Sequence, residues 1–455
     1  MAEYDLTPVN VAKVETKYRS IKTAIPVPES LEIFKDLQKS EPRSMQGQPP
    51  IIWHKANDFT VEDKWGNRWI DWSSCVLIAN AGHNHPKIAK ALHEIIDQGL
   101  LSTYVFIHEG RAKLTGMLQK LAPKGKDYSV FLLSSGSEAT ENCIKMAKTY
   151  AIEKYGPKRK YFVSFNNAFH GRTLASQLAG GMPKLKTWIV DGDRTFIQVP
   201  FPDGYKNEDV SFDLFLKTLE EKGIKPDEIA GVMSESYQGV GPDFMPVEYA
   251  QKLEKFCKGN DIILIMDEVQ AGFGRSGKMF TFEHYGISPD LIACGKGISS
   301  SLPISAVIGR KDIMDIYAPG SMTSTHSGSP LCVAAAIANL EVIEEEKLVE
   351  NSAKMGEILC RELQRIQKKY PERLGCFHGK GLVAGIQCVL PGTKTPDPAT
   401  ALEINIKCLQ KGLLMFSPVG IAGECLKIAP PLSITEDALR ESIQVFETAC
   451  NEVFG

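Results

Sequence analysis

Two short apolar runs in the chain each end at residues that can do chemistry. Residues 262–266 are followed by the carboxylates Asp267 and Glu268. Residues 291–294 are followed by Lys296, which stands between two glycines. Both runs are bounded by turn residues, and they predict buried strands of a parallel sheet. Because ligands bind at the carboxyl ends of such strands, we expect one crevice to receive an acid and a lysine.

An acid and a lysine in one crevice meet the two main demands of pyridoxal phosphate on a protein. A lysine forms a Schiff base with an aldehyde, and a carboxylate keeps a pyridine nitrogen protonated. Taken alone, Asp267 also fits a structural residue at a strand end, and Lys296 also fits a surface residue in a glycine turn. The pair, together with a phosphate loop, predicts the cofactor.

The candidate phosphate loop is the stretch Ser-Ser-Gly-Ser-Glu-Ala at residues 134–139, where a predicted strand passes into a predicted helix. A helix N-terminus offers unpaired N–H groups and a positive dipole end, which suit a phosphate. The same letters also fit a capping box between Ser135 and Glu138. Both interpretations stay open on these residues alone.

A resemblance to a known family covers most of the chain. The segments MDEVQAGFGRSGK and PDLIACGKGISSSLPISAVIGR resemble the class III aminotransferases from about residue 50 to the C-terminus. The resemblance implies the aspartate-aminotransferase fold (fold type I), with Lys296 and Asp267 as catalytic residues. It implies transfer of an amino group from an amine or ω-amino acid to a keto acid such as pyruvate or 2-oxoglutarate. The matching lysine holds the cofactor as a Schiff base in this family.

The resemblance also assigns residues to the cofactor and the substrate. In the family the S-G-S motif holds the phosphate, an aromatic residue and a valine lie on the two ring faces, and a glutamine binds the phenolic oxygen. A threonine reaches the phosphate of a neighbouring subunit, which implies a homodimer with shared sites. The implied cofactor-binding residues are Ser135, Gly136, Ser137, Phe169, His170, Glu235, Asp267, Val269, Gln270, Lys296 and Thr325, and the substrate-binding residues are Arg172, Val76 and Lys427.

Several of these residues have an alternative role. A lone Phe169 or His170 is more often part of a core, and Arg172 also fits a surface salt bridge. If Arg172 is the family's clamp, its planar fork suits a carboxylate or a sulfonate. Glu235 ends a predicted strand and fits a structural residue as well as a neighbour of the cofactor.

The chain departs from the family at the acidic-substrate switch. In the 4-aminobutyrate and ornithine aminotransferases a Q-G-E loop supplies a glutamate that pairs with an arginine near the C-terminus. Here the loop reads Gln238-Gly239-Val240, and Lys427 replaces the arginine. Lysine attracts a carboxylate as a point charge without bidentate geometry. The two replacements weaken the expectation of 2-oxoglutarate and favour pyruvate or a one-substrate reaction.

Composition excludes several classes of protein. The formal net charge of -3 gives no electrostatic argument for nucleic acid or for an anionic membrane. The 11 cysteines are scattered without a C-x-x-C pair, which argues against a disulfide framework and a zinc site. The N-terminus lacks the apolar core of a secretory signal, and no apolar run reaches membrane-spanning length. We therefore expect a cytoplasmic protein without a metal.

The order of predicted elements indicates an α/β fold of two domains. Strands alternate with helices from about residue 129, which predicts a large domain with a mostly parallel, doubly wound sheet. The last hundred or so residues mix helices and strands and predict a smaller α+β domain. We divide the chain into an N-terminal segment 1–72 that packs with the small domain, a large cofactor-binding domain 73–335, and a small domain 336–455.

Other reactions and one other class of protein share this scaffold. Amino-acid racemases and epimerases, and lyases that act on β-substituted amines, fit the same motifs and the missing switch. A non-catalytic regulator of this fold would need a DNA-binding domain, and the N-terminal segment is neither long enough nor basic enough for one.

Overall fold

The computed structural model describes residues 4–455, and the chain divides into two compact units. One unit is Pro86–Val349, and the other joins the chain up to His85 with Glu350–Gly455. The sequence-based division placed these boundaries at 72/73 and 335/336. We call Pro86–Val349 the large unit and the other the small unit.

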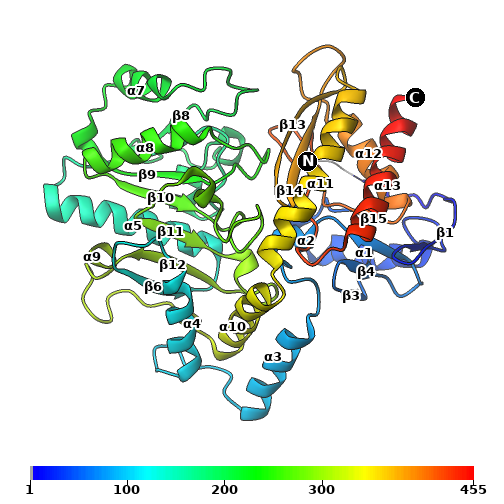
Figure 1. The fold of residues 1–455 in the computed structure, drawn as a ribbon, viewed down its shortest axis with the longest axis horizontal. Helices are drawn as coiled ribbons and strands as arrows, with labels where there is room; N and C mark the ends of the chain where they lie inside the picture. Colours follow the sequence, from blue (N-terminus) through cyan, green and yellow to red (C-terminus); the bar gives the residue numbers. More distant parts are fainter. Residues whose placement is uncertain (1–3) are drawn as a thin grey trace. The chain divides into compact units, whose positions relative to one another are not determined.

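Within the large unit the described strands form one seven-stranded sheet in the order β6-β12-β11-β10-β9-β7-β8 (Figure 1). β8, β7, β9, β10 and β11 run parallel, and β12 is antiparallel to both of its neighbours. The predicted mostly parallel sheet is confirmed. The strands are β6 (Tyr128–Leu133), β7 (Tyr161–Phe165), β8 (Phe196–Val199), β9 (Ile229–Glu235), β10 (Ile263–Asp267), β11 (Leu291–Cys294) and β12 (Ser305–Arg310).

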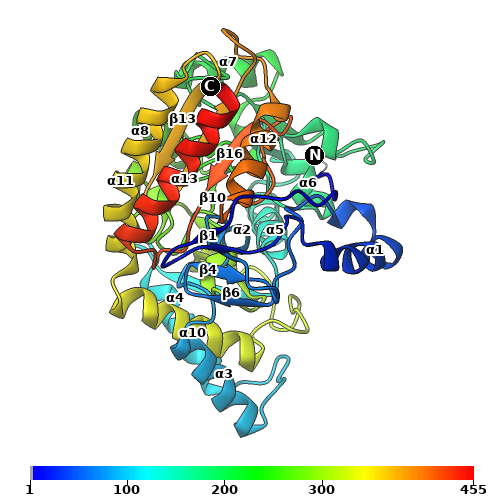
Figure 2. The ribbon, with the colours of Figure 1, turned by 90° about the vertical axis from the view of Figure 1, so that its right-hand side faces the viewer.

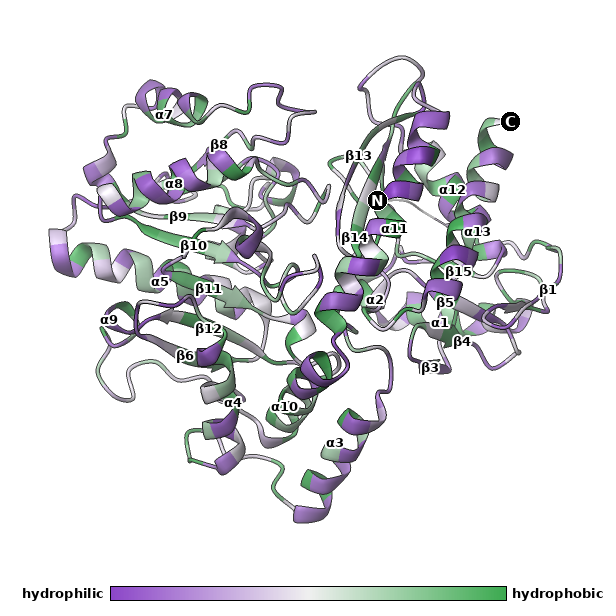
Figure 3. Cartoon of the chain, in the orientation of Figure 1, coloured by the Kyte–Doolittle hydropathy of each residue, from purple (hydrophilic) through white to green (hydrophobic). Residues whose placement is uncertain are grey.

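Helices flank this sheet and close its core. Helix α5 (Gly136–Tyr155) packs on β9, β11 and β12, and α8 (Val247–Gly259) packs on β10. The central strands are apolar in Figure 3, whereas α8 carries polar residues. All residues of β9, β10 and β11 are buried, as expected for parallel strands covered on both faces. The other helices of the unit are α3 (Pro86–Gln98), α4 (Glu109–Lys120), α6 (Leu174–Ala179), α7 (Phe212–Glu221), α9 (Lys311–Met314) and α10 (Pro330–Glu345).

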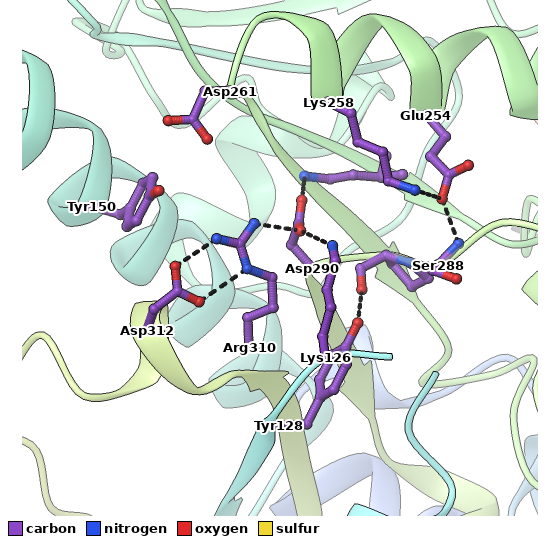
Figure 4. A network of polar contacts seen from close by, with 12 residues as sticks. Lys126, Tyr128, Tyr150, Glu254, Lys258, Asp261, Ser288, Asp290, Arg310 and Asp312 are labelled. Carbon is purple, nitrogen blue, oxygen red and sulfur yellow. Dashed lines mark hydrogen bonds and ion pairs between the residues drawn. The ribbon is translucent and has the colours of Figure 1, made fainter. Parts of the chain in front are cut away.

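A network of charges ties the strands together at the amino end of β11 (Figure 4). The buried carboxylate of Asp290 lies 2.8 Å from the Arg310 guanidinium and 3.1 Å from the Lys126 amino group. Its second oxygen accepts the Leu264 N–H at 3.0 Å. Arg310 also holds Asp312, so each of these charges has a partner.

The small unit contains two further sheets. Its described strands form a six-stranded sheet, in which β15 pairs with β5, and a three-stranded sheet in the order β13-β14-β16. Strands β4 and β5 of the larger sheet form an antiparallel pair. The strands are β1 (Val14–Glu15), β2 (Ser20–Ile21), β3 (Lys55–Asn57), β4 (Thr60–Glu62), β5 (Arg68–Asp71), β13 (Leu374–Lys380), β14 (Val383–Cys388), β15 (Leu413–Leu414) and β16 (Cys425–Ile428).

Long helices accompany these sheets. Figure 2 shows α11 (Leu348–Lys369) beside α13 (Glu436–Phe454), and an ion pair between Arg365 and Glu447 joins the two. The other α-helices are α1 (Leu31–Ser40) and α12 (Pro398–Gln410), and the short segment α2 (Ser74–Leu77) is a turn with positive φ values. The mixed α+β character predicted for the C-terminal part is confirmed.

Residues 4–455 contain neither a membrane-spanning helix nor a cluster of metal-binding side chains. No helix there has both the length and the apolar character needed to cross a membrane. Within the same residues no group of three or more His, Cys, Asp or Glu side chains gathers as a metal site.

Candidate active site

The carboxyl ends of three neighbouring strands bring the predicted acids together. Glu235 ends β9 and Asp267 ends β10, and the two residues are direct partners in the parallel ladder. Asp267 is in turn paired with Ala293 of β11, the strand that leads to Lys296. This edge of the sheet therefore carries an acid at the end of each of two strands and a lysine just after the third.

Asp267 is held by two hydrogen bonds. Its Oδ2 lies 2.8 Å from Nδ1 of the buried His170, and its Oδ1 accepts the Val269 N–H at 3.0 Å. Burial disfavours the charged form of His170, but the hydrogen bond and charge of Asp267 outweigh burial and raise the pKa of His170. The other ring nitrogen, Nε2, is buried without a hydrogen-bond partner. The site thus presents an oriented carboxylate backed by a histidine.

Lys296 has an unusual backbone conformation and unusual surroundings. Its φ is 41°, in the left-handed region that a non-glycine residue rarely adopts. Among residues 4–455 its half-buried amino group has no hydrogen-bond or ion-pair partner. Desolvation lowers its pKa, and the charges of Asp267 and Glu235 only partly oppose this. A strained, unpaired lysine whose neutral form is favoured is typical of a functional nucleophile.

The start of α5 lies against the loops that carry Val269 and Lys296. Ser135 and Glu138 form the capping box, so that alternative from the sequence is present in the structure. A Cβ on Gly136 would lie 2.6 Å from a methyl of Val269, and one on Gly295 would lie 3.1 Å from the same methyl. The capping box occupies the Glu138 N–H, and the first N–H groups of α5, at Gly136 and Ser137, lack an intrahelical acceptor. These two amides remain as donors for an anion.

The loop after β7 is fixed by contacts along its length. The Phe169 N–H donates to Glu235, and the His170 carbonyl accepts from the Thr140 hydroxyl at 2.7 Å. A Cβ on Gly171, whose φ is 134°, would lie 2.4 Å from the Ser137 hydroxyl. Only glycine fits there, so the loop approaches the start of α5 closely.

Arg172 is exposed, and its guanidinium lies 5.5 Å from the centroid of the Phe169 ring. Within the described chain it makes no ion pair, so the surface salt bridge that the sequence allowed is absent. Its charge is available to an anionic ligand.

Three further residues of the large unit bear on the prediction, namely Gln270, Val240 and Thr325. Gln270 is half-buried, and its side-chain oxygen lies 3.3 Å from the position that a Cβ on Gly239 would occupy. Val240 is buried in the turn that closes through the Gln238–Asp243 bridge. Thr325 is exposed in the segment between α9 and α10, and no contact within the described chain joins it to the α5 N-terminus.

Val76 and Lys427 belong to the small unit. Lys427 is buried in β16 opposite Gly385 of β14. Val76 is 43% exposed and stands in a turn in which Ser74, Cys75, Val76 and Leu77 all have φ between 46° and 63°. Such a left-handed turn without glycine costs about 1–2 kcal/mol per residue. Hydrogen bonds from Ser73 to Asp71 and from Ser74 to the Ala429 carbonyl hold the turn in place.

A group of hydroxyl residues that hold the site in place was not predicted from the sequence. Thr140 and Ser176 share a hydrogen bond of 2.7 Å behind the His170 loop, and Ser305 donates to the Ser135 carbonyl at 2.6 Å. Thr140 lies one helical turn after Gly136, and Ser305 is a polar residue at the start of a buried strand. A polar residue on an otherwise apolar face was the available signal.

These residues fit pyridoxal phosphate on the structure's own terms. The lysine amine is unpaired, the carboxylate of Asp267 is oriented, and His170 Nε2 is a buried polar atom without a partner. The amides that start α5 offer an anion site beside the same loops.

Comparisons with known proteins identify the family. The model of the class III aminotransferases matches residues 43–450. A 4-aminobutyrate aminotransferase of Mycobacterium leprae is 30% identical over 439 residues, which cover 94% of this chain and 97% of that protein. An isoleucine 2-epimerase of Lentilactobacillus buchneri is 34% identical over 417 residues, or 89% of this chain and 90% of that protein. A Bacillus anthracis aminotransferase structure matches with a TM-score of 0.84 and 29% identity over 93% of this chain and 99% of that one. The chain therefore belongs to the class III aminotransferases, a family of pyridoxal-phosphate-dependent enzymes.

Proposed function

We propose that this protein transfers an amino group from an amine or ω-amino acid to a keto acid, with Lys296 and Asp267 as its catalytic residues. The observation that carries the proposal is the amino group of Lys296. It lacks a partner within residues 4–455, its pKa is lowered mainly by desolvation, and it follows the strand next to Asp267. An amine in this state can act both as a nucleophile and as a base.

The cofactor would be held by residues from four segments. The Gly136 and Ser137 amides at the start of α5 would bind the phosphate, together with the serine hydroxyls. Phe169 and Val269 would lie on the two ring faces, and Gln270 would bind the phenolic oxygen. When bound, pyridoxal phosphate supplies an electron sink for the electron pair left at a deprotonated carbon.

The chain's own groups then move and hold the protons. The Lys296 amine takes the proton from the substrate carbon. The same amine later delivers a proton from the same side of the site. The Asp267 carboxylate keeps a proton on the ring nitrogen. His170 and the Val269 N–H hold that carboxylate in one orientation, so little reorganisation is needed during the reaction.

We infer that Arg172 binds the acidic group of the substrate, a carboxylate or a sulfonate. Its exposed guanidinium is free of ion pairs within the described chain and lies over Phe169. Val240 and Lys427 stand where the family has a paired glutamate and arginine, so the enzyme lacks that switch. This favours pyruvate over 2-oxoglutarate as the amino acceptor.

Half-reaction kinetics with pyruvate and 2-oxoglutarate test this function. Each keto acid is mixed with the amino form of the wild type, Arg172→Ala and the double variant Val240→Glu/Lys427→Arg, and cofactor absorbance is followed. We expect the wild type to react faster with pyruvate. Arg172→Ala should weaken the binding of acidic substrates by about 2 kcal/mol or more. The double variant should react faster with 2-oxoglutarate than the wild type does. A wild type that prefers 2-oxoglutarate, with that preference intact in Arg172→Ala, contradicts the specificity proposal.

Racemisation or epimerisation of an amino acid is the second candidate. Its support is the 34% identity to the isoleucine 2-epimerase and a 32% identity to an alanine/serine racemase of Pyrococcus horikoshii. The two reactions differ in their products. Scrambled stereochemistry without consumption of a keto acid would replace the transfer proposal, and ammonia release would indicate a lyase.

We also propose a homodimer in which Thr325 of one subunit reaches the phosphate site of the other. A run of exposed apolar residues supports a partner surface, with Leu101, Phe106 and Ile107 exposed by 55%, 75% and 89%. Light scattering should give the mass of two chains, and Ile107→Asp with Phe106→Asp should shift the mass toward that of one chain.

The large unit would be the cofactor-binding domain. A cytoplasmic location stays a prediction.

A further inference from the structure

Two buried glutamates at the ends of β9 and β10 each hold two backbone amides. Glu235 accepts the Phe169 N–H at 3.0 Å and the Gly239 N–H at 2.8 Å. Glu268, directly after β10, accepts the Thr281 N–H at 3.0 Å and the Phe282 N–H at 2.9 Å. The two residues therefore share the type of side chain and the kind of backbone partners, and Glu268 accepts the Ser236 hydroxyl in addition.

The amides that they hold belong to different parts of the large unit. Glu268 holds the short helical segment that begins at Thr281, which contains none of the predicted site residues. Glu235 holds the loop with Phe169 and the turn with Val240, which closes through a hydrogen bond from the Gln238 N–H to the Asp243 carbonyl. Only Glu235 thus links two segments of the site.

The two segments meet at the Glu235 carboxylate with little space to spare. A Cβ on Gly239 would lie 3.0 Å from Glu235 Oε1. Each carboxylate oxygen accepts one N–H. Burial raises the pKa of Glu235 to about 7, so above that pH both bonds go to a charged acceptor and are stronger than bonds between neutral groups. A shift of either segment would therefore strain or break a bond to the same side chain.

We propose that Glu235 is a positioning residue that sets the Phe169 loop and the 238–241 turn together. It acts through these two loops, and its loss loosens the aromatic ring that lies on the cofactor as well as the turn that carries Val240. The part of this inference that concerns the cofactor rests on the proposed function. The link between the loops is a property of the protein without cofactor.

Hydrogen exchange of the cofactor-free protein, read by mass spectrometry, tests the link. Glu235→Gln and its matched control Glu268→Gln keep the side-chain size but replace one acceptor oxygen by an NH₂ group. We expect Glu235→Gln to speed exchange about tenfold in peptides with Phe169 and Gly239, the size expected for loss of a charged hydrogen bond. Exchange at Thr281 and Phe282 should stay at the wild-type rate, and Glu268→Gln should give the reverse pattern. Unchanged exchange at Phe169 and Gly239 in Glu235→Gln overturns the proposal.

Cofactor binding provides the second measurement. Glu235→Gln should weaken pyridoxal-phosphate affinity about tenfold and alter the circular dichroism of the cofactor band, whereas Glu268→Gln should leave both at wild-type values. Faster exchange with an unaltered cofactor spectrum and affinity would make Glu235 structural only and overturn the positioning role. If the wild type binds no pyridoxal phosphate, the proposed function fails, and hydrogen exchange still decides the link. Should Glu235→Gln not fold, Gly239→Ala displaces the same carboxylate without removing its charge and should give the same two results.

Discussion

The two ends of the central sheet differ in how completely their charged and polar groups are paired. At the amino end of β11, Asp290 pairs with Arg310 and Lys126, and Arg310 also binds Asp312 (Figure 4). At the carboxyl end, Lys296 has no partner within residues 4–455, and His170 Nε2 is buried without one.

The paired charges around Asp290 stabilise the fold, whereas the unpaired amine of Lys296 is available to a ligand. Each buried polar group without a partner lowers stability by about 1–3 kcal/mol, so such groups are expected mainly where they have a function. The left-handed φ of Lys296 adds strain at the same end. We therefore expect changes at the two ends to separate activity from stability.

Lys296→Ala should give the largest effect on activity. Loss of the amine removes the nucleophile and the base together, so the transfer rate should fall below about one ten-thousandth of the wild-type value. The free energy of unfolding of the cofactor-free protein should not fall by more than about 1 kcal/mol, since the amine makes no contact there that the fold needs. Denaturant unfolding and a keto-acid assay check both, and a large loss of stability would contradict the comparison.

The same substitution at each end sharpens the contrast. Asp267→Asn should slow proton removal from the substrate about 10²–10⁴-fold, because a neutral amide no longer holds the ring proton. Asp290→Asn should leave that rate near the wild-type value but lower the free energy of unfolding by about 1–2 kcal/mol, because the half-buried Arg310 keeps Asp312 but loses the buried charge of Asp290. Single-turnover kinetics and urea unfolding of the two variants separate these outcomes. A kinetic defect in Asp290→Asn equal to that of Asp267→Asn would break the division.

The contribution of Glu268 to stability should depend on pH. Burial raises its pKa to about 7 against opposing hydrogen bonds from Ser236, Thr281 and Phe282. Because folding favours the protonated form, its stabilising contribution is complete below the ordinary carboxyl pKa near 4.5 and is lost as pH rises through about 7. The loss amounts to at most about 3 kcal/mol. Glu268→Gln should flatten the fall in cofactor-free stability between pH 5 and 8, and an unchanged slope would contradict the raised pKa.

Val76→Gly should give the smallest effect, and in the opposite direction. Glycine adopts the left-handed backbone of residues 74–77 without strain, so the free energy of unfolding should rise by up to about 1 kcal/mol. Val210 is similarly exposed, at 38% against 43%, but lies outside the left-handed region. Val210→Gly should therefore lower stability, and thermal unfolding of both variants makes the comparison.

Periodicity and motif spacing predicted the strands that carry Glu235, Asp267 and Lys296, because short buried parallel strands leave a clear apolar pattern. The same patterns could not show that His170 binds Asp267, since the two residues are far apart in the chain and meet only through the sheet. They also gave no sign of the left-handed turn at Val76, because glycine is the usual marker of such backbone and residues 74–77 contain none. The packing of α3 against α10 in the large unit is likewise a contact between segments far apart in the chain, which the local patterns do not contain.

Peptide mapping after borohydride reduction tests the central claim that Lys296 is the residue reserved for the cofactor. Reduction fixes a lysine-bound aldehyde as a stable secondary amine, so mass spectrometry reads its position directly. We predict that the cofactor mass appears on the peptide that contains Lys296 and on no other lysine at comparable yield. Attachment to a different lysine, with the Lys296 peptide unmodified in an active enzyme, would contradict the account.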